Sequence, residues 1–399
     1  MNHYVEQLAR IAGKDKRTII GLMSGTSLDG LDIALCELTG SGPETKVQVK
    51  HFLTVPFNQA FKEIVKSVFS KRMVDLENIC LLNPWIAEQH AAMILEALAQ
   101  WKVSPSEVDL IASHGQTVYH APKRLHGKKE FGNGTLQLGD GDHLAVKTGI
   151  ITISDFRQKH IAAGGEGAPL AVYGDYFIFR KAGENRIMLN IGGIANFTFL
   201  PGDLDMTRIF STDTGPGNTL MDAFARFQFN QSYDENATIA RQGKVNESYL
   251  KALKEDPFFQ QAFPKTTGPE LFNLKYGEQA LLNANISAIS HVDTMATLNR
   301  FSADTIADAI KKTLSDQEIY AVYSSGGGIH NPLLMEQIQL QLPHCRFYTT
   351  SDLEINPDAK EAVLFALLAN ETVAGGNTSF GGGSKDIPAV TMGKISFPG

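Results

Sequence analysis

The chain has 399 residues, and its 43 acidic and 36 basic side chains leave a formal net charge of −7. Neither a basic stripe nor a long run of lysine and arginine is present, which argues against general binding to nucleic acids or anionic membranes. Three cysteines without a C-x-x-C pair indicate neither a disulfide framework nor a structural zinc site.

The length exceeds what one hydrophobic core usually serves, so two domains are expected, and 43% hydrophobic residues can fill both. The first 17 residues lack an apolar core, and no later window approaches about 18 unbroken apolar residues. We therefore expect a cytoplasmic protein whose partners are small molecules, with neither a membrane nor a nucleic-acid partner.

The first motif is a turn between two predicted strands, Thr18–Met23 and Asp32–Leu38. Gly25 and Gly30 permit positive φ and leave backbone N–H groups accessible to an anion. The turn carries the hydroxyl side chains of Ser24, Thr26 and Ser27. This pattern predicts a β-hairpin whose tip can hold a phosphate, with a simple turn as the alternative.

A short predicted strand, Val108–Ala112, leads into Ser113-His114-Gly115-Gln116-Thr117. Open α/β sheets place ligands at the carboxyl ends of their strands, so His114 and Gln116 are candidate ligand contacts. The alternative for His114 is a hydrogen bond to a neighbouring loop. The segment 123–134, with several basic residues, is interpreted as a solvated surface insertion.

Another strand, predicted over 149–154, ends at Asp155-Phe156-Arg157. An arginine after a strand can bind an oxyanion through its planar donor fork, which makes Arg157 a candidate for a carboxylate or a phosphate. A structural pair between Arg157 and Asp155 is equally possible. The small-residue run that follows marks the predicted domain boundary.

A second glycine-tipped hairpin is predicted around Gly192-Gly193, with strands 186–191 and 196–200 on either side of the turn 192–195. A third glycine element, Gly326-Gly327-Gly328, follows a predicted strand and precedes Asn331-Pro332, an N-cap and a first helical residue. Two similar hairpins suggest a duplicated fold. Neither the P-loop pattern nor the G-x-G-x-x-G pattern of dinucleotide binders follows a strand.

Asp213 lies between a predicted strand, 208–212, and the turn Thr214-Gly215-Pro216-Gly217, with Asn218 as the expected cap of the next helix. A helix N-terminus favours negative charge, so the Asp213 carboxylate would stay ionised and accept a proton. The alternative is that Asp213 only braces the turn. Near the C-terminus, Glu361 lies in the first turns of another predicted helix, where acidic residues are also common for dipole reasons.

Several of these segments, taken in order, are similar to the anhydro-N-acetylmuramic acid kinase family, within the actin, Hsp70 and sugar kinase superfamily. The resemblance runs from about Thr18 to Gly393. The matching segments are Gly21-Leu22-Met23-Ser24-Gly25-Thr26-Ser27-Leu28-Asp29-Gly30, Ser113-His114-Gly115-Gln116-Thr117, Thr135-Leu136-Gln137-Leu138-Gly139-Asp140, Asp155-Phe156-Arg157, Ala162-Ala163-Gly164-Gly165-Glu166-Gly167-Ala168-Pro169-Leu170, Leu189-Asn190-Ile191-Gly192-Gly193, Asp213-Thr214-Gly215-Pro216-Gly217-Asn218 and Gly326-Gly327-Gly328.

The resemblance implies an α/β fold of two lobes, with duplicated mixed sheets, flanking helices and a ligand cleft between the lobes. The N-terminal lobe would comprise 1–155 and 376–399 with the first phosphate hairpin. The C-terminal lobe would comprise 156–375 with the second phosphate hairpin, the catalytic aspartate and a glycine turn for adenosine. The family also suggests a homodimer.

The implied reaction uses ATP and Mg²⁺: Asp213 deprotonates a water that opens a 1,6-anhydro sugar, and the released O6 takes the γ-phosphoryl group. Asp29 and Asp32 are conceivable indirect metal contacts, although turn stabilisation and a solvated strand face explain them equally well. The implied ATP and phosphate contacts are Gly25, Thr26, Ser27, Leu28, Asp29, Gly30, Leu31, Asp32, Gly192, Gly193, Gly326, Gly327 and Gly328. The implied substrate contacts are His114, Gln116, Thr117, Arg157 and Glu361.

The chain departs from the family pattern at His160, at 171–174 and at Pro269, which takes the place of a frequent arginine. An ATP-dependent kinase of a related amino sugar is therefore an alternative. A catalytically silent sugar or nucleotide sensor of the same fold is a second alternative, although the retained Asp213 and the hydroxyls of the first hairpin disfavour it.

Overall fold

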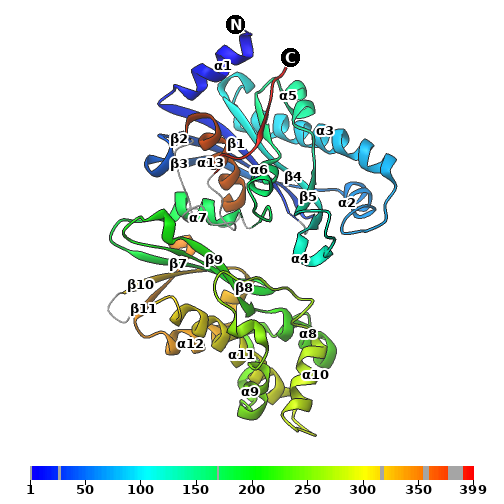
Figure 1. Ribbon diagram of the computed structural model, residues 1–399, viewed down its shortest axis with the longest axis vertical. Helices are drawn as coiled ribbons and strands as arrows, with labels where there is room; N and C mark the ends of the chain where they lie inside the picture. Colours follow the sequence, from blue (N-terminus) through cyan, green and yellow to red (C-terminus); the bar gives the residue numbers. More distant parts are fainter. Residues whose placement is uncertain (1, 26–27, 169, 315–318, 354–358, 376–389) are drawn as a thin grey trace. The chain divides into compact units, whose positions relative to one another are not determined.

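The computed structural model describes the chain except residues 1, 26–27, 169, 315–318, 354–358 and 376–389. The chain divides into two compact units (Figure 1). Unit 1 comprises Met1–Phe179 and Ile355–Gly399, and unit 2 comprises Arg180–Glu354. None of the described helices is long and apolar enough to cross a membrane.

Unit 1 is built on a mixed sheet with the strand order β12-β6-β4-β1-β2-β3, and β5 pairs with β4. The β1, β2 and β3 strands form an antiparallel meander, whereas β4 runs parallel to both β1 and β6. The strand bounds are β1 (Lys16–Ser24), β2 (Gly30–Thr39), β3 (Lys46–Pro56), β4 (Leu110–Ala121), β5 (Gly134–Leu138), β6 (Thr152–Ser154) and β12 (Lys394–Ser396).

The helices of unit 1 include α13, which packs closely on β1. A Cβ built on Gly21 of β1 would lie 1.9 Å from the carbonyl oxygen of Ala362, so only glycine permits this approach of helix to strand. The helix bounds are α1 (His3–Ala12), α2 (Gln59–Lys66), α3 (Leu76–Trp101), α4 (Lys123–His126), α5 (Gly141–Thr148), α6 (Phe156–Ala162), α7 (Ala171–Phe179) and α13 (Lys360–Ala374).

Unit 2 repeats the same strand pattern in the order β11-β10-β7-β8-β9. The β7, β8 and β9 strands form an antiparallel meander, and β10 runs parallel to both β7 and β11, as β4 does beside β1 and β6. The strand bounds are β7 (Asn185–Ile191), β8 (Ile194–Leu200), β9 (Phe210–Pro216), β10 (Tyr320–Ser325) and β11 (Cys345–Thr349). The predicted α/β fold with duplicated mixed sheets is therefore confirmed.

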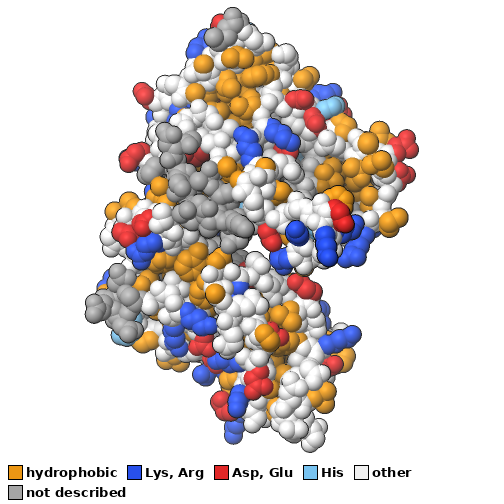
Figure 2. Space-filling view, in the orientation of Figure 1, with side chains coloured by type: hydrophobic (Ala, Val, Ile, Leu, Met, Phe, Trp, Pro, Cys, Tyr) orange, Lys and Arg blue, Asp and Glu red, His pale blue; other side chains and the backbone are white. Residues whose placement is uncertain are grey.

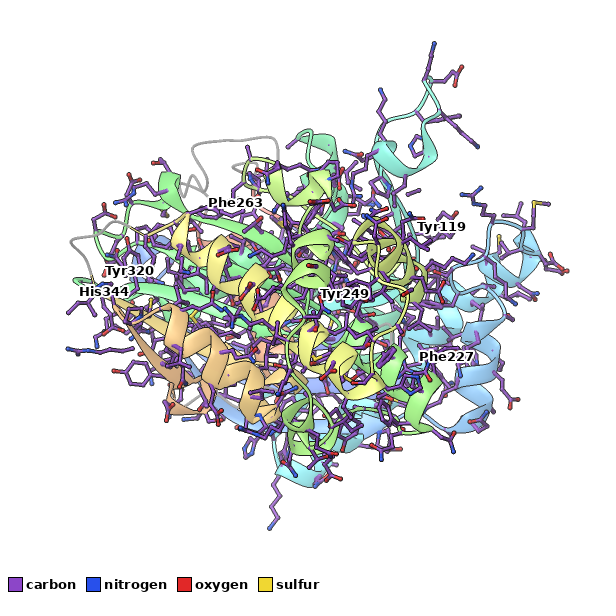
Figure 3. The ribbon with its side chains drawn as sticks, turned by 90° about the horizontal axis from the view of Figure 1, so that it is seen from below. Tyr119, Phe227, Tyr249, Phe263, Tyr320 and His344 are labelled. Atoms are coloured by element: carbon purple, nitrogen blue, oxygen red, sulfur yellow. The ribbon has the colours of Figure 1, made fainter. Side chains whose placement is uncertain are left out.

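The helices of unit 2 cover its sheet around α11, most of whose residues are buried. Tyr249 and Tyr320, both labelled in Figure 3, belong to the same apolar core as Phe301 of this helix. The helix bounds are α8 (Thr219–Phe229), α9 (Glu247–Leu253), α10 (Leu274–Asn283), α11 (His291–Lys311) and α12 (Pro332–Gln341).

The expected lobe boundaries, after residues 155 and 375, do not coincide with the two units. The α6, α7 and α13 helices all belong to unit 1. A buried polar network explains the place of α13: Arg17 of β1 donates to Asn370 Oδ1 at 2.6 Å, and Glu371 accepts from the Gly42 N–H. Removing α13 from unit 1 would take away the acceptors of the Gly42 N–H and of the Arg17 Nε, and leaving buried donors unpaired is costly.

Several predicted elements begin or end elsewhere. The sequence predicts a helix that begins at Asn83-Pro84, whereas α3 starts at Leu76 after an Asp75 cap, so Pro84 lies inside it. The β4 strand continues past Ala112 to Ala121, because β1 and β5 supply hydrogen-bonding partners along its polar second half. The strand expected over 149–154 is shorter, since β6 spans only Thr152–Ser154.

Candidate functional site

The first predicted phosphate hairpin is present in unit 1. The β1 and β2 strands pair antiparallel up to Ser24 opposite Leu31, and the tip lies between these residues. Two of the predicted phosphate contacts at the tip, Thr26 and Ser27, lie outside the described residues. Leu28 is buried with φ 58°, so it anchors the turn in the core, and Asp29 beside it is exposed.

Gln116 of β4 supports this hairpin from the neighbouring strand. Its side chain is fully buried; Ser24 Oγ donates to its Oε1, and its Nε2 donates to the Gly25 carbonyl at 3.3 Å. The structure thus places Gln116 against the hairpin tip, where its amide holds the backbone. The sequence suggested a loop residue facing a ligand, because a glutamine beside Gly115 does not look like a buried strand position.

His114 and Arg157 form a buried pair. The Arg157 Nε donates to His114 Nε2 at 2.8 Å, and the His114 ring lies 4.7 Å from the Phe365 ring of α13. Because the arginine donates to Nε2, the neutral imidazole carries its proton on Nδ1. Burial, with the Arg157 charge adding to it, holds the pKa of His114 well below its usual value, so the ring stays neutral.

Arg157 is oriented from two sides. Besides its bond to His114, its Nη1 donates to the Gly167 carbonyl at 2.6 Å. Burial lowers the pKa of Arg157 to about 10, and the Glu361 carboxylate opposes that shift. Asp155, the alternative partner expected from the sequence, instead pairs with Lys394 of β12. The guanidinium therefore keeps its charge, and its Nη2 group, which has no hydrogen-bond partner among the described residues, is available for an anion.

Glu361 is the second residue of α13, as expected. Its side chain keeps contact with solvent, but the surrounding protein removes part of the water around the carboxyl and thereby raises its pKa. The positive charges of Lys360 and Arg157 oppose this rise, and the negative charge of Asp32 adds to it. Asp32 itself is half-buried and accepts a hydrogen bond from the Thr54 hydroxyl at 2.6 Å. Within unit 1, Arg157 thus pairs with the neutral His114, and the charge of Glu361 interacts with those of Arg157 and Asp32.

The remaining substrate candidate of unit 1, Thr117, is half-buried on β4 and accepts from Gln137 Nε2 at 3.1 Å. The basic segment beyond it is ordered by its own contacts: Arg124 pairs with Glu166 at 3.1 Å, and Asn133 donates to the Gly165 carbonyl. Lysine and arginine side chains gather over α4 in Figure 2. The segment is exposed, in agreement with a surface insertion.

In unit 2 the three glycine segments meet. The N–H groups of Gly217 and Asn218 donate to the Gly193 and Gly192 carbonyls, each at 2.9 Å. A Cβ on Gly326, which has φ +84°, would lie 2.7 Å from the Ile191 carbonyl oxygen, and one on Gly328 would lie 2.2 Å from the Ile191 side chain. Backbone thus approaches backbone around the second hairpin, whereas Gly193 and Gly327 are exposed.

Asp213 lies inside β9, not in the turn after it. Its half-buried carboxylate accepts from the Thr267 N–H at 2.8 Å, and its own N–H donates to the Lys265 carbonyl at 2.9 Å. The expected side-chain cap by Asn218 is absent from α8; its amide donates to the Ile191 carbonyl at 3.5 Å. The N–H donor that supports the carboxylate thus comes from the 265–267 segment, which the sequence did not connect to Asp213.

Lys265 is the residue near Asp213 that sequence reasoning missed. It is only 6% exposed, and its charge interacts with the Asp213 carboxylate. Its signal in the sequence was the Lys265-Thr266-Thr267 segment, whose distance along the chain from Asp213 gave no reason to join the two.

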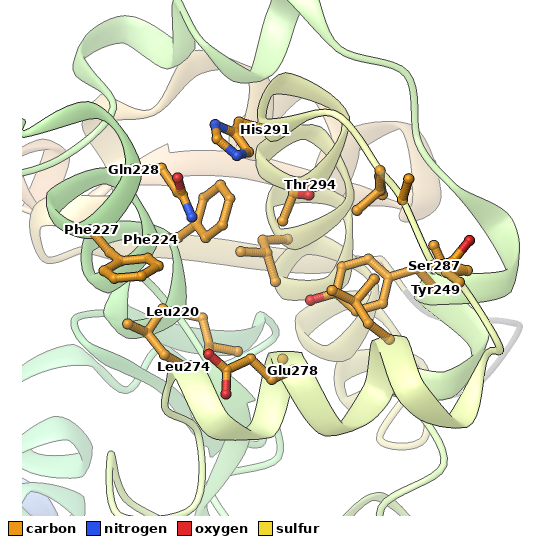
Figure 4. A pocket seen from close by; sticks show the side chains of 16 residues that line it. Leu220, Phe224, Phe227, Gln228, Tyr249, Leu274, Glu278, Ser287, His291 and Thr294 are labelled. Atoms are coloured by element: carbon orange, nitrogen blue, oxygen red, sulfur yellow. The ribbon is translucent and has the colours of Figure 1, made fainter.

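Among the described residues no group of three or more histidine, cysteine, aspartate or glutamate side chains could hold a metal ion. Mg²⁺ commonly binds through one or two carboxylates, several waters and substrate phosphates, so the exposed Asp29 and the half-buried Asp32 remain compatible with such a cation. Unit 2 also has a cavity of about 290 Å³ between α8, α10 and α11 (Figure 4), and none of its lining residues is a predicted site residue.

Comparison with known proteins gives a consistent result. A family model described as anhydro-N-acetylmuramic acid kinase matches residues 17–397. Proteins named anhydro-N-acetylmuramic acid kinase from Pseudoalteromonas atlantica (strain T6c / ATCC BAA-1087) and Pseudoalteromonas translucida (strain TAC 125) are 56% and 52% identical, each covering 100% of both chains. One from Caldanaerobacter subterraneus subsp. tengcongensis is 36% identical over 98% of this chain and 100% of its own. This chain therefore belongs to the anhydro-N-acetylmuramic acid kinase family.

Proposed function

We propose that this protein is an ATP-dependent kinase that opens 1,6-anhydro-N-acetylmuramic acid and phosphorylates its O6, in the recycling of cell-wall sugars. The observation that carries the proposal is the 56% identity with a relative of that name over the full length of both chains. The residues that the resemblance assigns to the reaction are present in both units, and their local contacts suit those roles.

In the proposed reaction Asp213 takes a proton from water while the water oxygen bonds to the anomeric carbon. The bond between this carbon and the bridging O6 breaks, and the O6 oxygen attacks the γ-phosphorus of ATP. One water and one ATP are consumed; N-acetylmuramic acid 6-phosphate and ADP are formed, and Asp213 then releases its proton to solvent. The Thr267 N–H on Asp213 Oδ2 favours the ionised carboxylate that this step needs.

Phosphoryl transfer requires positioning and charge neutralisation more than covalent chemistry by the protein. The first hairpin, stiffened by Gln116, would hold phosphate oxygens through its tip, and the exposed glycines of the second hairpin and of the 326–328 turn would leave room for the nucleotide. Mg²⁺ bound with ATP would supply neutralisation of the phosphate charge, with Asp29 and Asp32 as the residues of this chain that could hold it through water.

For the sugar, Arg157 is the proposed partner of the lactyl carboxylate. Its Nε and Nη1 are fixed by His114 and Gly167, so the remaining N–H groups are oriented in advance, which lowers the entropy lost on binding. Glu361 and Thr117 are proposed to contact the sugar hydroxyl or amide groups. Gln116 is proposed to act on the hairpin, because its full burial leaves no surface for the sugar.

The test is mass spectrometry of the protein with Mg-ATP, 1,6-anhydro-N-acetylmuramic acid and ¹⁸O water, run beside Asp213→Asn. The expected product is ring-opened, phosphorylated and labelled with one ¹⁸O at the anomeric position, and the variant should form none. A folded protein that binds ATP but forms no product would indicate a related amino sugar as substrate. Failure to bind ATP as well would favour a silent sensor.

A further inference from the structure

Lys265 is joined to the Asp213 strand by a short ladder of hydrogen bonds. The Lys265 N–H donates to Thr212 Oγ1 at 3.1 Å, and the Lys265 carbonyl accepts the Asp213 N–H at 2.9 Å. Two residues further on, the Thr267 N–H reaches Asp213 Oδ2. The same segment thus fixes both the backbone and the carboxylate of Asp213.

The side chain of Lys265 runs into an aromatic pocket. Its Nζ donates to the Phe258 carbonyl at 2.9 Å and lies 4.1 Å from the centre of the Phe258 ring. The rings of Phe259 and Phe263 lie at 5.6 and 5.7 Å, all within the range of cation–π attraction, and Phe263 is labelled in Figure 3. The ammonium is therefore held in one place.

A charged lysine is energetically unfavourable in this pocket. Burial disfavours the charged form and, with the nearby Lys312 charge adding to it, lowers the pKa of Lys265 to about 8; the Asp213 carboxylate opposes that shift. Methionine could fill a similar apolar space without any buried charge. Packing alone does not account for an ammonium here, whereas its hydrogen bond to the Phe258 carbonyl does, because that bond anchors the segment that contacts Asp213.

We propose that Lys265 is a positioning residue for the reaction: its ammonium, held by the Phe258 carbonyl, fixes the 265–267 segment, whose Thr267 N–H favours the ionised, proton-accepting form of the Asp213 carboxylate. This inference rests on the proposed role of Asp213 as base. The charge of Lys265 adds to this effect, since any free energy by which Asp213 favours charged Lys265 equally favours charged Asp213 in the presence of that lysine.

The test is a ¹³C NMR titration of aspartate-labelled protein, in which Asp213→Asn identifies the Asp213 signal. In Lys265→Met the pKa of Asp213 should rise by on the order of one unit, and the acidic limb of the kcat/KM profile should move to higher pH with it. Lys265→Arg, which keeps the charge, should return both towards the wild type. Lys265→Gln serves as a second neutral variant if methionine prevents folding.

Lys312→Met is the matched control. Lys312 also donates its ammonium to a backbone carbonyl, that of Phe259 at 3.0 Å, and lies near the Phe263 ring, but it is exposed. This variant should leave the Asp213 titration in place. A Lys265→Met protein whose Asp213 titrates as in the wild type overturns the inference, even if its activity falls through lost packing. Full activity of Asp213→Asn would instead overturn the role of Asp213 as base, and the NMR coupling would still be measurable.

Discussion

The two phosphate hairpins have the same place in two sheets of the same strand order, yet they are stabilised by different chemistry. In unit 1, a buried side chain from the next parallel strand, Gln116, holds the tip at Ser24 and Gly25. In unit 2, the backbone N–H groups of residues 217–219 bind the carbonyls of Gly192 and Gly193. Behind each hairpin the packing also differs, with α13 against Gly21 in unit 1 and the 326–328 turn against Ile191 in unit 2.

This difference shows that a duplicated topology conserves strand order more strictly than it conserves the means of support. In the first hairpin, a substitution of the supporting side chain should cost stability in proportion to the number of hydrogen bonds that it removes. The backbone support of the second hairpin depends on Gly217 and Gly326, because a Cβ at either position would enter the space of a carbonyl. A substitution in one unit should therefore lower the stability of that unit before it affects the other.

The largest effect is expected from Gly21→Ala, which places a Cβ 1.9 Å from the Ala362 carbonyl oxygen. Because both groups belong to backbone, α13 must move from β1, and unit 1 should lose more than about 3 kcal/mol of stability. Hydrogen exchange read by mass spectrometry should quicken in β1 and α13 and stay unchanged in β7 and α8. Gly134→Ala in β5, whose Cβ would meet only Ala121 O at 3.8 Å, is the control. Equal protection in both variants would contradict the packing argument.

His90 gives unit 1 a pH dependence. It is fully buried beside Phe57 and Phe61, neither ring nitrogen has a hydrogen-bond partner among the described residues, and burial lowers its pKa to about 4. Below pH 6.5 the unfolded chain binds a proton here that the folded chain does not, so this site loses stability as pH falls from 6.5 towards 4.

His90→Leu should remove that loss. Compared with the wild type, the variant should gain about 2 to 3 kcal/mol more at pH 4.5 than at pH 7, measured by urea unfolding at both pH values. The same substitution at the exposed His344 should give no such difference. A constant offset between His90→Leu and wild type at the two pH values would show that His90 takes up its proton as readily in the folded protein as in the unfolded chain.

Gly217→Ala should weaken the second hairpin, since its Cβ would lie 2.3 Å from the Gly192 carbonyl oxygen. A loss of about 2 kcal/mol in unit 2 is expected, together with weaker ATP binding by calorimetry. Gly193→Ala, whose Cβ would come no nearer than 3.8 Å to Thr219, should leave stability unchanged and weaken ATP binding alone. If Gly217→Ala binds ATP normally, the hairpin does not need this backbone support.

The smallest effect is expected from Gln116→Leu, which leaves Ser24 and the Gly25 carbonyl without their partner. The expected cost is about 1 kcal/mol in unit 1, with a KM for ATP raised several-fold and a nearly unchanged kcat. Gln137→Leu, on the adjacent β5, removes an amide that bonds Thr117 and Thr135 instead, so it should leave the KM for ATP as it is. Matching KM values for the two variants would argue against a role of Gln116 in the hairpin.

The sequence predicted well those features that depend on neighbouring residues in the chain. Both hairpins join strands that are adjacent in the chain, and their glycines and β-branched residues carry the necessary signal, as does the Asn331 cap of α12. The polar second half of β4 was predicted as a loop, because its burial depends on β1 and β5 on either side. The link of Asp213 to Lys265 and Thr267 was not predictable, since it joins segments far apart in the chain with no periodic pattern between them.

The discontinuity of unit 1 has a consequence for synthesis. Unit 2 is one continuous stretch, 180–354, whereas unit 1 needs α13, which leaves the ribosome only after all of unit 2. Until then Gly21 and Arg17 on β1 lack the helix that covers them, and apolar surface of β1 stays open. Unit 2 is therefore the first of the two units that can complete its fold. The sheet of unit 1, which is synthesised earlier, is the part that most needs chaperone protection until α13 appears.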